Sequence, residues 1–349
     1  MDWADIATAL HAPGGWLPLA FLAIMGLAML AYVVLDGYDL GVGILLRSAS
    51  DGDKDTMIAS IGPFWDANET WLVLGVGVLL VAFPPAHGLI LGALYLPVAL
   101  MLVGLTLRGV AFDFRTKAGA DRKAMWNTVF NAGSVLASLA QGYMLGRWVT
   151  GFRDDLWAVG FSALIAMCLL GAYMLLGAGW LIMKTEGALQ RSALRWARFS
   201  LGLTALGVLA ISAATPLVSA SIFERWFSWP GVLLLLPLPA ATLLLFLVVA
   251  RSLRRLEERL ARGSVRGSVR HDGLPFAGAV GIVVLAFFGL AYSLFPWLVV
   301  DRLTIWQAAS STESLWIIFV GACVVLPVIV GYTVFSYHVF RGKATALEY

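Results

Sequence analysis

The chain has 349 residues, of which 60% are hydrophobic and only 13% are charged, and its mean hydropathy is +0.86. A soluble domain of this size does not need so much apolar surface, so the composition excludes a soluble globular protein and indicates a polytopic membrane protein. The net charge of +3 is small, and the positions of the basic residues are more informative than their excess.

Nine apolar runs are long enough, alone or with a flanking turn, to cross a bilayer as helices. The first follows a segment that holds Asp2 and Asp5 but no basic residue, so we expect a permanent helix, continuing towards Arg47, rather than a cleaved signal. The second is short, so Asp66 to Thr70 should form its first turn. The nine predicted spans are, approximately, 16–35, 71–86, 88–107, 124–146, 156–183, 199–223, 229–250, 274–300 and 315–340.

These spans predict an all-α fold with a single integral membrane domain. Short loops within each half favour two bundles of four helices, over about 16–146 and 156–300, followed by the ninth helix over about 315–340. Residues 251–273 are predicted to form a basic cytoplasmic loop. We interpret its arginine-rich first part as an extension of the seventh helix near anionic lipid headgroups rather than a nucleic-acid site. Gly263–Arg270 reads as a flexible linker.

The basic residues are divided unequally between the two sides of the membrane. If the nine helices alternate in direction, one side carries only Arg147, Arg153, Arg225 and Arg302, whereas the other carries nineteen basic residues. Arg108 remains at a helix end. Because cytoplasmic loops are enriched in Lys and Arg, we expect the N-terminus outside and the C-terminus in the cytoplasm.

Ionisable residues gather near the predicted cytoplasmic ends of the first three helices, where such groups are costly and need a reason. One interpretation is an entrance for protons or ions from the cytoplasm. The other is structural, with two acids capping the second helix and the arginine neutralising a carboxylate. A structural pair needs only one carboxylate, so the number of acids favours the first interpretation. The candidates are Asp36, Asp39, Asp66, Glu69, Arg108 and Asp113.

The cysteines and histidines of this chain do not form a pattern typical of a haem or metal site. Cys168 and Cys323 lie within apolar runs and are expected to be buried small side chains. No two histidines fall on facing positions in mid-membrane, and the sequence has no Cys-x-x-Cys-His, so we expect no haem or zinc ligand in this chain. The histidines are His11, His87, His271 and His338.

Small and polar residues within the spans are expected to serve helix packing. Gly41 and Gly43 lack the third glycine of a dinucleotide fingerprint, and favour a close helix contact or a break in the first helix. Asn127, Asn131 and Gln141 on the fourth span are expected to form hydrogen bonds between helices.

Four segments resemble subunit II of the cytochrome bd-type quinol oxidases, including the cyanide-insensitive branch. They are Asp36–Gly43 (DGYDLGVG), Trp65–Trp71 (WDANETW), Arg108 with Phe112–Arg115 (FDFR), and Leu303–Ala308 (LTIWQA). Length, helix number and orientation also agree along the whole chain. The segments in the first half are the more specific.

The resemblance implies a complex of the bacterial cytoplasmic membrane that oxidises quinol and reduces dioxygen to water with protons from the cytoplasm. Two b-type haems and one d-type haem are then expected in a partner, subunit I, and a small single-helix third subunit is possible in such complexes. The resemblance also implies that subunit II contributes a proton pathway, with Asp66 its first candidate. Asp36, Asp39, Arg108 and Asp113 follow as its neighbours, and Glu69 stands where some branches carry an amide.

Two other functions remain open. The chain can be a scaffold that only stabilises its haem-bearing partner, its acids being structural. It can also be a secondary transporter that couples transport to ions, which requires discontinuous helices at mid-membrane in both halves.

Overall fold

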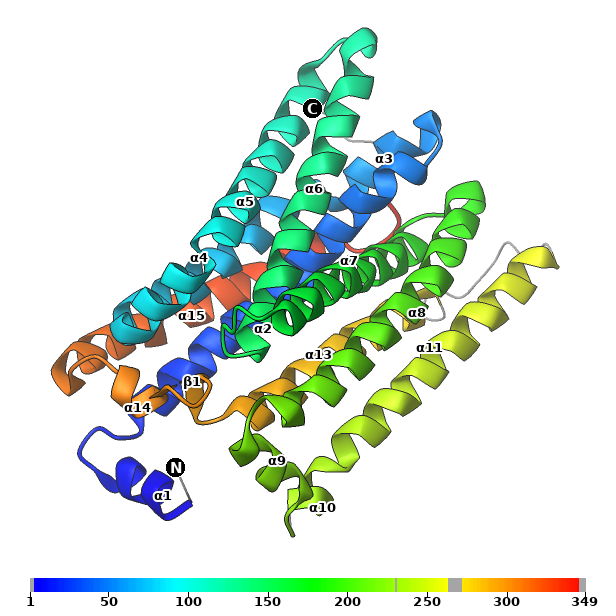
Figure 1. Cartoon of the computed structure of the whole chain (residues 1–349). Helices are drawn as coiled ribbons and strands as arrows, with labels where there is room; N and C mark the ends of the chain where they lie inside the picture. Colours follow the sequence, from blue (N-terminus) through cyan, green and yellow to red (C-terminus); the bar gives the residue numbers. More distant parts are fainter. Residues whose placement is uncertain (1–2, 230, 263–271, 345–349) are drawn as a thin grey trace. The chain divides into compact units, whose positions relative to one another are not determined.

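The computed structural model describes residues 3–229, 231–262 and 272–344, and almost all of its regular structure is helical (Figure 1). Two short strands form the only sheet in those residues. The helices are α1 (Trp3–His11), α2 (Leu17–Leu45), a 3₁₀ turn (Leu46–Ser48), α3 (Asp51–Ile61), α4 (Trp65–Ala82), α5 (Pro84–Lys117), α6 (Ala120–Val149), α7 (Leu156–Lys184), α8 (Gly187–Val218), α9 (Ala220–Phe227), α10 (Gly231–Leu235), α11 (Pro237–Ala261), α13 (Leu274–Leu294), α14 (Ile305–Ala308) and α15 (Thr312–Val339); the strands are β1 (Trp297–Val299) and β2 (Leu303–Thr304).

Among the described residues, eight helices are long and apolar enough to cross a membrane. They coincide with eight of the nine predicted spans and establish a multi-pass membrane protein. The remaining prediction, 124–146, falls within α6, a helix of 30 residues. At 1.5 Å per residue α6 is about 45 Å long, which is sufficient for a bilayer, but it is not among the eight described helices that are apolar enough to cross one.

The first helix continues without a break, as predicted, through α2 and the 3₁₀ turn to Ser48. The second begins at Trp65, so Asp66 lies in its first turn as expected. The eighth span was predicted to reach Val300, which is wrong, because α13 ends at Leu294 and the chain then enters the β1–β2 hairpin. Hydropathy alone does not distinguish this buried apolar hairpin from the end of a helix.

The chain divides into two compact units. The first comprises Met1–Leu35, Pro63–Ala93 and Leu294–Arg341. Its core joins the start of α2 to the end of α4 and to the hairpin, through Leu17, Phe21, Val78, Ala82, Phe83, Ala86, Leu298, Ile305, Ala308 and Leu315.

The segment between β2 and α15 is fixed by polar caps within this first unit. Thr304 caps α14, and its hydroxyl accepts a hydrogen bond from the backbone of Gln307, whose side chain accepts one from the Thr304 backbone in return. The indole of Trp306 donates to the carbonyl of Gly15 at 2.9 Å. The predicted Leu303–Ala308 segment is therefore a capped turn.

The second unit comprises Asp36–Gly62, Leu94–Ser293 and Gly342–Tyr349. Within it, α7 packs against both α6 and α8, and α8 packs in turn against α11; Figure 1 shows α8 and α11 running side by side. The close approach of α7 to α2 depends on glycine. A Cβ on Gly41 would lie 1.8 Å from the carbonyl oxygen of Tyr173, and Gly177 faces the same segment of α2. The glycines therefore serve packing and do not break the first helix.

The arginine-rich segment after the seventh span is helical to Ala261, as the sequence predicts. Leu253 and Leu256 are buried in this extension. The linker predicted over Gly263–Arg270 lies outside the described residues.

Candidate functional site

A buried ion pair joins α5 to α2 inside the second unit. Nη1 of Arg108 lies 2.6 Å from Oδ1 of Asp36, and both side chains are almost completely buried, at 1% and 0% exposure. Asp39, three residues further along α2, is also fully buried. Residues three apart on a helix lie on the same face, so both carboxylates belong to one region. Removing either partner of such a pair would leave a buried charge without compensation.

Polar side chains of α6 and α7 lie around the same part of α2. The hydroxyl of Tyr173 donates to the side-chain carbonyl of Gln141 at 2.6 Å. The ring of Tyr173 packs on Gly37, the residue next to Asp36, where a Cβ would come within 2.8 Å of the ring. The amide of Asn131 donates to the carbonyls of Gly43 and Ile44 at 2.9 and 2.8 Å. The interior of this unit is therefore unusually polar for a chain of such hydropathy.

The interhelical role predicted for the three amides is present in the structure. Asn131 joins α6 to α2, Gln141 joins α6 to α7, and the side chain of Asn127 accepts a hydrogen bond from Nε of Arg115 on α5. Sequence reasoning missed Tyr173 as the partner of Gln141, because no spacing within α7 distinguishes its hydroxyl from any other tyrosine in an apolar helix.

Asp113 does not join the buried pair. It is exposed on α5, five residues beyond Arg108. The buried charge at that end of α5 is instead Arg115, whose guanidinium binds the carboxylate of Asp55 on α3. Burial alone would raise the pKa of Asp55, but hydrogen bonds from Lys123 and Arg115 outweigh burial and hold the pKa below its ordinary value.

Asp66 and Glu69 belong to the first unit, in the first two turns of α4. Asp66 is exposed and Glu69 is half-buried. Between them Asn68 is buried; its amide donates to the carbonyl of Leu35 at 3.3 Å and its carbonyl accepts from the hydroxyl of Tyr337 at 3.2 Å. The start of α4 is thus fixed by an amide, while both acids remain accessible at the surface of this chain.

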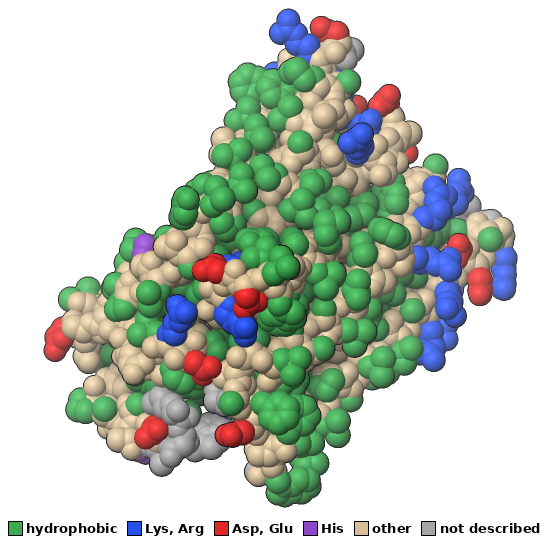
Figure 2. All heavy atoms as spheres, viewed as in Figure 1, with side chains coloured by type: hydrophobic (Ala, Val, Ile, Leu, Met, Phe, Trp, Pro, Cys, Tyr) green, Lys and Arg blue, Asp and Glu red, His purple; other side chains and the backbone are tan. Residues whose placement is uncertain are grey.

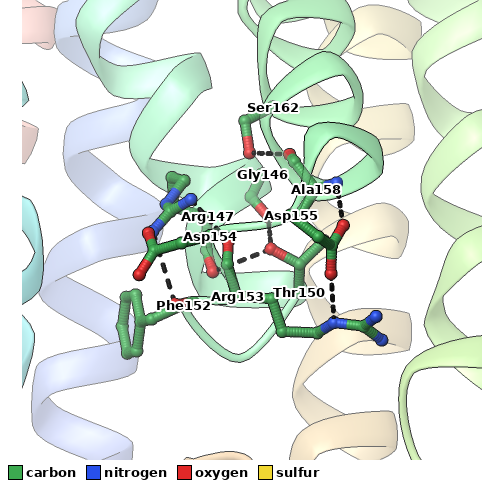
Figure 3. Close-up of polar contacts among 9 residues, drawn as sticks. All are labelled: Gly146, Arg147, Thr150, Phe152, Arg153, Asp154, Asp155, Ala158 and Ser162. Carbon is green, nitrogen blue, oxygen red and sulfur yellow. Dashed lines mark hydrogen bonds and ion pairs between the residues drawn. The ribbon is translucent and has the colours of Figure 1, made fainter.

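A second polar cluster, not predicted from the sequence, organises the turn between α6 and α7 (Figure 3). The guanidinium of Arg147 is buried and donates to the carbonyls of Phe152 and Arg153 and to the carboxylate of Asp154. Phe152 has a φ of 61°, a left-handed conformation that these hydrogen bonds hold. Arg147 therefore fixes the shape of this turn, which indicates a structural role.

In the part of the chain that the structure describes, no three His, Cys, Asp or Glu side chains come together in a way that could hold a metal ion.

Together the fold and the buried pair define a multi-pass helical membrane protein with ionisable groups in its interior. The family model for cytochrome bd terminal oxidase subunit II matches residues 17–340, and the chain belongs to this family. The resemblance found in the sequence motifs is thereby confirmed.

Individual relatives agree with this assignment. The chain is 27% identical over 344 residues to cytochrome bd ubiquinol oxidase subunit 2 of Bacillus subtilis, covering 93% of this chain and 96% of the relative. It is 32% identical over 183 residues to cytochrome bd-I ubiquinol oxidase subunit 2 of Escherichia coli, covering 48% of each. The fold is similar to a chain of the bd oxidase from Geobacillus thermodenitrificans, with a TM-score of 0.71 at 16% identity over 93% of this chain and 98% of that one.

Proposed function

We propose that this chain is the haem-free second subunit of a quinol:oxygen oxidoreductase of the aerobic respiratory chain. In this assignment it pairs with a subunit I that holds two b-type haems and one d-type haem. Family membership and relatives named as ubiquinol oxidase subunits support the assignment. They also favour it over a secondary transporter.

We further propose that the chain contributes a proton pathway from the cytoplasm. The observation that carries this step is the burial of two carboxylates, Asp36 and Asp39, on one face of α2. Arg108 offsets one negative charge through its ion pair with Asp36. Two carboxylates buried on one helix face beside one guanidinium form a group that can take up and release a proton inside the chain.

Asp66 remains the first residue to test for this pathway. It lies in the first turn of α4 and is exposed, so its carboxylate is accessible from outside this chain. Glu69, half-buried one turn later, and the exposed Asp113 are secondary candidates.

The proposed direction of proton transfer depends on how the chain is oriented in the membrane. Nineteen basic residues on one side of nine alternating helices, against four on the other, support a cytoplasmic C-terminus and an outer N-terminus in the bacterial cytoplasmic membrane. This arrangement needs α6 to cross the membrane as the fourth of nine spans.

The location of the haems can be tested on the intact complex purified through this chain. We expect a visible spectrum with b-type and d-type haem bands. All bands should persist when His11, His87, His271 and His338 are together replaced by Gln. Loss of one band with subunit I still bound would place a haem ligand in this chain, and the absence of all bands in the unsubstituted complex would contradict the oxidase assignment.

A purely structural role is the second candidate, because the Arg108–Asp36 pair also joins two helices. Under that assignment, substitutions of the acids lower activity only as far as they lower the haem content of the complex. Turnover per haem therefore separates the two functions.

A further inference from the structure

One end of the α8–α11 pair carries a concentrated positive charge, which we name the arginine surface. Figure 2 shows Lys and Arg side chains gathered over the end of these two helices. All of the arginines concerned are exposed. The arginine surface consists of Arg191, Arg195 and Arg198 on α8 and Arg251, Arg254, Arg255, Arg259 and Arg262 at the end of α11.

Packing between the two helices directs these side chains outward. Leu253 and Leu256 are buried on α11, and Leu194 and Ala197 are buried on α8. The carboxylate of Glu257 binds the guanidinium of Arg198, which aligns the two helices at this end. The apolar side chains therefore occupy the contact, and the arginines are left on the outer faces.

The charge on this surface is not balanced within the two helical segments. Residues 187–198 and 251–262 contain eight arginines and two glutamates, a net charge of +6. One of the glutamates, Glu257, is already engaged with Arg198. Such a surface favours a polyanionic partner.

Distance from the apolar span decides which arginines can reach lipid headgroups. The apolar run of α11 ends at Ala250, and residues 251–262 extend it by about 18 Å. A headgroup layer is only about 5–8 Å thick on each side of the hydrocarbon core. Arg251, Arg254 and Arg255 therefore fall within that layer, whereas Arg259 and Arg262 extend beyond it.

We propose that the arginine surface binds the phosphate groups of anionic phospholipids through Arg251, Arg254 and Arg255. A guanidinium donates two parallel hydrogen bonds to a phosphate and is held here on a packed helix, so the site recognises the headgroup and does not merely attract charge. This binding is independent of the proposed proton pathway and rests only on α8 and α11 spanning the membrane.

The test uses the intact complex purified in a neutral detergent and titrated with either phosphatidylglycerol or phosphatidylcholine. Bound lipid is counted by native mass spectrometry. The variant Arg251→Gln/Arg254→Gln/Arg255→Gln is compared with Arg191→Gln/Arg259→Gln/Arg262→Gln, which removes the same charge further from the apolar span. Retention of subunit I is checked in both variants.

We expect the first variant to bind phosphatidylglycerol more weakly, by about fivefold for each arginine removed. The second variant should change much less, and binding of phosphatidylcholine should stay the same in all three proteins. Equal losses of phosphatidylglycerol binding in the two variants would show that the lipid is held by the overall positive charge and not by a site at these three arginines. Unchanged phosphatidylglycerol binding in the first variant would also overturn the proposal. Loss of subunit I from the first variant alone would overturn it in favour of a protein contact.

Discussion

At the scale of single residues, the Arg108–Asp36 pair is a buried feature that we expect to tolerate substitution poorly. Both side chains are buried, so removing one charge leaves the other unpaired in a medium of low dielectric. We expect Arg108→Met or Asp36→Asn to destabilise the complex by about 3–5 kcal/mol each. The double variant should be less destabilised than the sum of the two, because it leaves no charge unpaired.

Thermal unfolding of the purified complex, followed through the haem absorbance, checks this prediction. If the two single effects add in the double variant, the pair does not contribute as an interacting unit.

The lowered pKa of Asp55 makes its contribution to folding stability depend on pH. Hydrogen bonds from Lys123 and Arg115 hold its folded pKa below the value of an unfolded Asp. A depressed carboxyl pKa stabilises the folded state above the unfolded pKa of about 3.9, and this contribution is lost as the pH falls through the lower, folded pKa. The carboxylate is half exposed, so we expect a modest effect.

Unfolding temperatures measured from pH 6 to pH 3 should therefore converge between the original protein and Asp55→Asn as the pH falls. A constant difference over this range would contradict the assignment.

At the scale of helices, the contact between α2 and α7 depends on the absence of a side chain at Gly41. A Cβ there would lie 1.8 Å from a backbone carbonyl, which cannot rotate away. We expect Gly41→Ala to separate the helices and to destabilise the complex by at least about 1–3 kcal/mol. Gly202→Ala on α8 is the matched control, since nothing lies within 4 Å of its added methyl.

The yield of assembled, haem-containing complex measures the difference. Equal yields for Gly41→Ala and Gly202→Ala would show that the close approach of α2 and α7 is not required.

The helices could be predicted from the sequence to a large extent, because a run of about twenty apolar residues has few other stable structures in a membrane. The exception has a physical reason. The β1–β2 hairpin is as apolar as the end of a span, so hydropathy extended the eighth predicted helix too far. Contacts between residues far apart in the sequence were harder to predict. Asp36 and Arg108 are 72 positions apart, and the sequence indicated that acids and an arginine gather there without showing which carboxylate the arginine binds.

At the scale of the whole molecule, the proposed orientation requires α6 to cross the membrane. Single cysteines introduced at Lys117 and Asp154, two exposed positions that flank α6 on either side, should then be labelled by an impermeant thiol reagent from opposite sides. We expect Lys117→Cys to react only from the cytoplasm and Asp154→Cys only from outside. Reaction of both from one side would contradict nine spans and the direction of the proton pathway.

We propose that this subunit of a cytochrome bd-type oxidase moves protons through its own carboxylates. The most direct measurement is quinol-driven oxygen uptake per haem in the assembled Asp66→Asn complex, beside Asp121→Asn as a control at another exposed acid. We expect the Asp66→Asn complex to retain its haem content and to turn over at least about tenfold more slowly. One positioned proton-transfer group typically contributes about 10²–10⁴-fold to a rate. Normal turnover per haem in an intact Asp66→Asn complex would contradict the proton role of Asp66, and a loss of activity in proportion to lost haem would favour the scaffold.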